Sequence, residues 1–149
     1  MCVGWAGVAT LAVGMSVACD PLTLPTDILG SNSLAGDAIA LTSITPSAGT
    51  HLRAGRTVTF TATLTYTLAS AARGQIAVVI QDQFDRNLRP PDSYQTFVQI
   101  ARGTGTVTLS DSIALPGSGV SYVSVFFPLS AGLSPPPTDV IVKVSYPVD

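Results

Sequence analysis

Thr57 to Leu68, TVTFTATLTYTL, decides the fold class of this chain. Threonine occupies every second position, and an apolar residue follows each threonine. A period of two places the two sets of side chains on opposite faces of a β-strand, whereas a helix has a period near 3.6. The segment therefore predicts a half-buried strand with its threonine face toward solvent. The expected buried positions include Phe60 and Leu64, and the expected accessible positions include Thr59, Thr61 and Thr63.

Other short apolar segments follow at regular intervals, and turn residues separate them. The clearest separators are Arg73-Gly74, Gly103 and the Pro-Gly-Ser-Gly run at 116–119. No long amphipathic helix is visible, so we expect an all-β, two-sheet sandwich of seven strands. The predicted strands are residues 41–45, 57–68, 75–81, 94–101, 106–115, 121–127 and 140–146.

The composition of the 149 residues agrees with an all-β domain and excludes one class of partner. Hydrophobic residues make up 46%, which is enough for one core, while charged residues make up only 11%. There is no Glu, and Lys143 is the single lysine. The net charge of −2 excludes the strongly basic surface that tracks nucleic-acid phosphates.

The N-terminal segment predicts export. Residues 3–18 are uncharged and apolar, but they are fewer than the ~20 residues that span a bilayer. The string Ser16-Val17-Ala18-Cys19 resembles the lipobox of bacterial lipoproteins, although Ser16 stands where Leu is usual. The resemblance implies a signal peptide at 1–18 and a lipid on Cys19, which anchors the mature protein to a membrane of the cell envelope. Ordinary cleavage after Ala18 and an uncleaved apolar tail are the alternatives.

Residues 19–40 are expected to be the lipid-attachment cysteine and a linker, because prolines and glycines interrupt any regular pattern there. The domain is then expected at 41–149. Within it, the string PSAGTHLRAGRTVTFTATLTYTL (46–68) resembles the opening of bacterial immunoglobulin-like and fibronectin III-like surface domains. That resemblance implies an immunoglobulin-like β-sandwich with an adhesive, spacer or ligand-binding role.

Catalytic and metal-binding constellations are not apparent in the sequence. His51 is the only histidine, and both cysteines, Cys2 and Cys19, lie near the N-terminus. Asp82 and Asp85 lack the spacing of a calcium loop. We therefore expect no enzyme, no catalytic residue, no cofactor and no metal.

Asp111 breaks the alternation of its predicted strand, because it shares parity with Val107 and Leu109. A regular strand would bury this carboxylate, which is costly without a partner. We therefore expect a β-bulge near residues 110–112 that turns Asp111 outward.

Charge is expected to collect at one end of the domain, because consecutive loops of a simple sandwich alternate between its ends. The loop with Arg53 and Arg56 then shares an end with the loop at 83–93, and Asp82 and Asp149 lie nearby. Exposed ion pairs that hold these loops are one interpretation. A recognition surface is the other, because Arg and aromatic residues are enriched at binding hot spots. The candidate partner-binding residues are Arg53, Arg56, Phe84, Arg86 and Arg89.

The sequence thus predicts a non-catalytic cell-envelope module, periplasmic or surface-exposed, with a binding or spacer role. Its expected partners are the lipid bilayer, through the N-terminal anchor, and an unidentified protein or glycan. An envelope assembly or ligand-binding factor that acts through a sheet edge is an alternative, and an exposed edge strand with few charges would support it. A small β-sandwich hydrolase is the remaining alternative.

Overall fold

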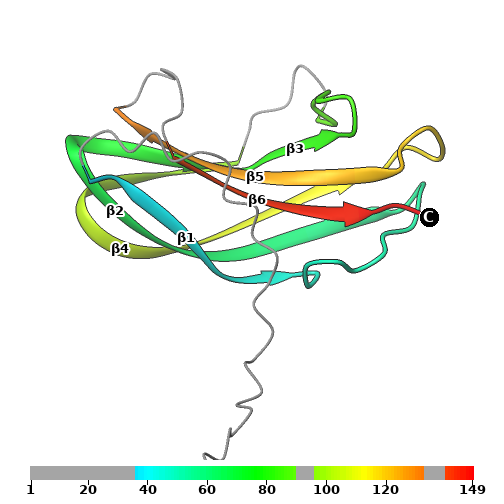
Figure 1. The fold of residues 1–149 in the computed structure, drawn as a ribbon, viewed down its shortest axis with the longest axis horizontal. Coiled ribbons are helices and arrows are strands. Elements are labelled where there is room, and N and C mark those ends of the chain that lie inside the picture. The colour runs from blue at the N-terminus through cyan, green and yellow to red at the C-terminus, as the bar shows by residue number, and fades with distance from the viewer. Residues whose placement is uncertain (1–35, 90–95, 133–139) are drawn as a thin grey trace, which may run out of the picture.

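A computed structural model describes residues 36–89, 96–132 and 140–149 (Figure 1). These residues form strands and loops, with six strands where the sequence predicted seven. The strands are β1 (Ala38–Thr45), β2 (Thr57–Ala77), β3 (Val79–Asp82), β4 (Phe97–Ala114), β5 (Tyr122–Ala131) and β6 (Val140–Pro147). The predicted signal peptide, Cys19 and most of the predicted linker lie outside the described residues, as does the predicted start of the fourth strand at Tyr94.

The six strands form one open antiparallel sheet, in which β2 takes the central place. The first part of β2 lies between β1 and β4, and its last residues lie between β4 and β5. β5 then pairs with β3 along one edge and with β6 along the other. Figure 1 shows β2 and β4 curving together, which brings β1 and the start of β2 beneath β5 and β6.

The curve of β2 is made at residues 69–72, where the sequence predicted a break between two strands. Leu68 pairs with Gly103, and the next pair is Arg73 with Ala101, so four residues of β2 bulge opposite one residue of β4. Gly74 does not form a turn but allows the backbone of β5 to lie close to β2. A Cβ at position 74 would lie 2.6 Å from the carbonyl oxygen of Ser130. The predictions of strand ends at Leu68 and Ala101 are wrong, because the paired strands bend together and continue.

Asp37 stabilises this bulge. Its carboxylate accepts hydrogen bonds from the backbone N–H groups of Ala69 at 2.6 Å and Ser70 at 2.9 Å, and from the Ser70 hydroxyl. Arg102 donates from Nε to the carbonyl of Ala71 at 3.3 Å. Asp37 is only 4% exposed, and β1 begins at Ala38. Residues 38–40, which the sequence assigned to the linker, therefore belong to the sheet, and Asp37 binds the bulge beside them.

The alternation of the first part of β2 is confirmed. Phe60 and Leu64 are buried, and their threonine neighbours keep solvent contact on the other face. The inner faces of β2 and β6 meet at the Phe60 ring, which lies 5.2 Å from the ring of Tyr146 in β6. Tyr146 is fully buried, and its hydroxyl donates to the carbonyl of Pro46 at 2.8 Å.

The outward threonines of β2 form a ladder of hydroxyl contacts with β4. Each contact joins residues directly opposite in the register, which is the closest arrangement across an antiparallel pair. The pairs are Thr59–Ser112 at 2.7 Å, Thr61–Ser110 at 2.9 Å and Thr63–Thr108 at 3.3 Å.

The bulge predicted at residues 110–112 is wrong. Thr59 to Thr61 pair with Ser112 to Ser110 without a register shift, so Asp111 points inward opposite Phe60. Asp111 is buried there because the guanidinium of Arg89 forms an ion pair with its carboxylate. The bulge was predicted because burial of an unpaired carboxylate is costly, and the ion pair with Arg89 offsets that cost.

Candidate functional site

Three loops meet at the end of the sheet marked C in Figure 1. They are the β1–β2 connection (46–56), the segment after β3 (83–89) and the β4–β5 connection (115–121). The N–H of Gly55 donates to the carbonyl of Pro116 at 3.0 Å, which joins the first loop to the third. The Gln83 side chain donates to the carbonyl of Gly119 at 2.8 Å, which joins the second loop to the third. The structure therefore brings together the two loops that the sequence placed at a shared end.

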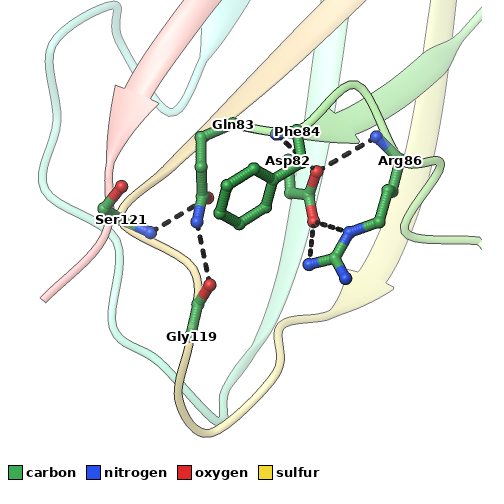
Figure 2. Close-up of polar contacts among 6 residues, drawn as sticks. All are labelled: Asp82, Gln83, Phe84, Arg86, Gly119 and Ser121. Atoms are coloured by element: carbon green, nitrogen blue, oxygen red, sulfur yellow. Dashed lines mark hydrogen bonds and ion pairs between the residues drawn. The ribbon is translucent and has the colours of Figure 1, made fainter.

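Asp82 organises the second loop from the last position of β3 (Figure 2). One carboxylate oxygen accepts from the N–H groups of Phe84 at 2.8 Å and Arg86 at 3.0 Å. The other accepts from the Arg86 guanidinium at 2.8 Å and 2.7 Å. An aspartate that accepts from the backbone two residues later forms an Asx-turn. Asp82 therefore fixes both the backbone of the turn and the position of the Arg86 side chain.

The environment of Asp82 favours its ionised form. Burial of the carboxyl raises its pKa, but the hydrogen bonds from Arg86 and from the N–H of Phe84, with the Arg86 charge, outweigh that effect. The pKa of Asp82 therefore lies below its ordinary value of 3.8. A carboxylate held in this way is a weak base and is not protonated near neutral pH.

Phe84 projects from the turn that Asp82 fixes. Its side chain is 64% exposed, and the Arg86 guanidinium lies 5.0 Å from the ring centroid, within cation–π range. Asp85 adopts a φ of 59°, in the left-handed region that Asn and Asp tolerate in turns. The Oε1 atom of Gln83 accepts from the N–H of Ser121 at 3.2 Å, so the turn is tied on both sides. An exposed aromatic ring and a cation are thus held in fixed relative positions.

A shallow groove of about 370 Å³ lies beside this turn. It separates the Asp82 turn from the β4–β5 connection, and both walls carry polar and apolar groups. Its lining residues are Asp82, Arg86, Asn87, Leu88, Pro116, Ser118, Gly119 and Val120.

The structure separates the five candidate residues into two sets. Arg53 and Arg56 are exposed on the β1–β2 connection, and Phe84 and Arg86 are exposed on the neighbouring loop. Arg89 differs, because its side chain is only 15% exposed and pairs with the buried Asp111. Arg89 therefore belongs to the interior of the domain and not to the loop surface.

Two further groups at this end complete the site. His51 lies 2.9 Å from the carboxylate of Asp149, and both side chains are about two-thirds exposed. The roles of Asp82 and Gln83 in fixing the turn were not predicted from the sequence. The sequence signal for Asp82 was its position at the end of a strand. Its carboxylate binds the N–H groups two and four residues later, as is typical of an aspartate that caps a turn.

The described ranges hold neither a cluster of metal ligands nor a membrane-spanning helix. No group of three or more His, Cys, Asp or Glu side chains in them is placed to hold a metal ion. Both Asp82 oxygens already accept from N–H donors, so a cation there would have to displace Arg86. Residues 36–89, 96–132 and 140–149 also contain no helix long and apolar enough to cross a membrane.

No family model and no curated protein matches the chain.

Proposed function

We propose that this protein is a non-catalytic module of the bacterial cell envelope, exported through residues 1–18 and anchored by a lipid on Cys19. Its immunoglobulin-like β domain binds a protein or glycan partner through the loop end that carries Phe84. The presentation of Phe84 is the observation that supports this function: an aromatic side chain, 64% exposed, stands on a turn fixed by Asp82.

The fixed turn favours binding because it lowers the entropy cost of association. Exposed aromatic and arginine side chains contribute much of the energy at protein interfaces. Each rotamer-rich side chain that must be immobilised costs ~0.5–1.5 kcal/mol, and a preorganised surface avoids part of that cost. Arg86 is already held by Asp82 and stacked on Phe84, so the pair meets a partner with little rearrangement.

The chemistry of the loop end supports binding over catalysis. A general acid or base works best when its pKa lies near the operating pH. The pKa of Asp82 is lowered, and its oxygens accept from Phe84 and Arg86. Asp82 therefore serves the turn as a structural group.

The binding function is tested by capture from an envelope extract with the full chain and two variants. We expect Phe84→Ser to reduce the captured partner at least tenfold, because the ring is the exposed anchor. Thr65→Ala, on an exposed position of β2 away from the loops, is the matched control and should capture as much as the parent. Equal capture by Phe84→Ser and by the control, with equal melting temperatures, would exclude the loop end as the binding surface.

The anchor is tested separately from the binding surface. Lipidation of Cys19 predicts that the mature protein partitions into detergent and that Cys19→Ser moves it to the soluble fraction. Mass spectrometry of the mature N-terminus identifies the modified residue. An unmodified N-terminus in a soluble parent protein contradicts the anchor but leaves the binding surface intact.

The length of β4 favours a second candidate function, partner binding through a sheet edge. β4 runs for 18 residues and, among the described strands, pairs with β2 alone. Its charged residues are Arg102 and Asp111, and Asp111 points inward. An added strand would use the backbone groups of this edge. Thr104→Lys with Thr106→Lys should then abolish capture, whereas Phe84→Ser should not change it.

A further inference from the structure

The two outward faces of the sheet differ in chemistry. The outward positions of β1, the first part of β2 and the second part of β4 hold only Ala, Ser and Thr, and we call this the hydroxyl face. The opposite outward face, over the end of β2, β3, β5, β6 and the start of β4, carries large apolar side chains. We call their cluster the apolar face, and its members are Val79, Phe97, Phe126, Pro128 and Ile141, which lie around the buried Ala77.

Strand register makes the apolar face continuous. Ala77 pairs with Phe97, and Val79, two residues after Ala77, pairs with Phe126. Pro128 pairs with Ile141 in the neighbouring row. Phe97 is 52% exposed although it stands in a regular strand, where a polar residue would serve solubility. Phe97 is exposed, and Val79, Phe126, Pro128 and Ile141 are half-buried. A contiguous, solvent-accessible apolar cluster of this kind marks an interaction surface.

The charged residues that the structure describes on this side, Arg73 and Lys143, are both cations. Lys143 lies over the Phe126 ring, with its Nζ 5.3 Å from the centroid, and Arg73 is exposed at the edge of the same side. The outward positions of the described strands on this side include no Asp. A second copy of the chain would therefore bring cations toward cations. A negatively charged surface would complement both residues.

We propose that the apolar face docks the domain onto an anionic lipid bilayer, with Phe97 and Phe126 at the interface and Lys143 toward the headgroups. Aromatic side chains favour the membrane–water interface, and a basic residue beside an anionic surface adds to the attraction. The inference rests on the proposed lipid anchor, which would keep the domain at high effective concentration near the membrane. The hydroxyl face then points away from the membrane.

The experiment measures binding of the full chain with Cys19→Ser to vesicles, so that no lipid contributes. Vesicles of phosphatidylglycerol and phosphatidylcholine are compared with vesicles of phosphatidylcholine alone, at low and high salt. We expect stronger binding to the anionic vesicles and weaker binding at high salt. Lys143→Gln should weaken anionic binding about fivefold and Phe97→Ser about tenfold. Thr61→Ser, on the hydroxyl face, is the matched control and should bind as the parent does.

The variants separate the apolar face from the N-terminal segment, which is identical in all of them. Equal binding of Phe97→Ser, Lys143→Gln and the control, with equal melting temperatures, overturns the proposal. So does a dimer, measured by light scattering, that Phe97→Ser dissociates without changing vesicle binding, because the occupant is then a second copy. The state of Cys19 in envelope protein is measured separately, so failure of the anchor and failure of the docking face are distinguishable.

Discussion

Arg89, in the segment after β3, and Asp111, on the inner side of β4, form an ion pair inside the domain. The side chain of Asp111 is 6% exposed and that of Arg89 is 15% exposed. The pair ties the segment after β3 to β4 beside Phe60, which Asp111 opposes in the register.

The first prediction concerns this pair. Arg89→Ala should lower the free energy of unfolding by about 3–5 kcal/mol, because it leaves the Asp111 carboxylate buried without its cation. The double variant Arg89→Leu with Asp111→Val should recover most of the loss, since it removes both charges together. Urea unfolding measures the free energy of unfolding of the parent, of Arg89→Ala and of the double variant. Arg53→Ala, at an exposed arginine, is the control and should change stability by less than about 0.5 kcal/mol. A loss from Arg89→Ala no larger than that of the control would show that the pair does not stabilise the fold.

The second prediction concerns the core. Phe60→Ala should cost about 3–5 kcal/mol of unfolding free energy, because Phe60 is 1% exposed and packs against Tyr146. Thr61→Ala removes one exposed hydroxyl contact with Ser110 and should cost about 1 kcal/mol or less. Chemical denaturation of the two variants compares the faces directly. A larger loss from Thr61→Ala than from Phe60→Ala would invert the face assignment.

The third prediction concerns acid. Burial raises the pKa of Asp37, but hydrogen bonds from Ser70 and Ala69 and the charge of Arg102 outweigh it, so the folded-state pKa lies below 3.8. The unfolded chain therefore binds the Asp37 proton more readily than the folded chain does. The contribution of Asp37 to stability is full above pH 3.8 and is lost as the pH falls through the lower folded-state pKa. Asp82 adds a second contribution of the same sign.

The acid prediction is measured with thermal melts from pH 6 down to pH 2. Asp37→Asn should be less stable than the parent at pH 6 and should lose less stability on acidification, because one of the two carboxylates no longer titrates. Parallel curves for the parent and Asp37→Asn would contradict a role for Asp37 in the acid response.

The fourth prediction concerns alkali. Burial raises the pKa of Tyr146 above its ordinary value of 10.0. The unfolded chain therefore loses this proton first, and the contribution of Tyr146 to stability is full below pH 10 and is lost as the pH rises above it. Tyr146→Phe should cost about 1 kcal/mol at neutral pH, because the bond to Pro46 is lost, and should flatten the alkaline decline. Denaturant unfolding at pH 7 and pH 11 tests this, and an equally steep decline in Tyr146→Phe would refute it.

The site was accessible to sequence reasoning only in outline. Loop order placed Arg53, Arg56, Phe84 and Arg86 at one end because loop alternation depends only on the order of the strands. The inward turn of Arg89 was not predictable, because its partner Asp111 lies in another strand and the two meet only after β4 has paired with β2. Without the partner, burial of Asp111 looked too costly, and a bulge was the cheaper local solution.

The sequence by itself determined the all-β class and the face of the first part of β2, because the period-two pattern from Thr57 to Leu68 is a local property of the chain. The tertiary structure decided whether the strand ends after Leu68 or continues, and therefore how many strands the sheet has. Arg73-Gly74 has the local chemistry of a turn, but the chain continues there because β5 approaches Gly74 and Asp37 binds the bulged N–H groups of Ala69 and Ser70. A residue such as glycine permits the backbone angles of a turn but does not require them. Contacts with distant residues decide which of the permitted angles the chain adopts.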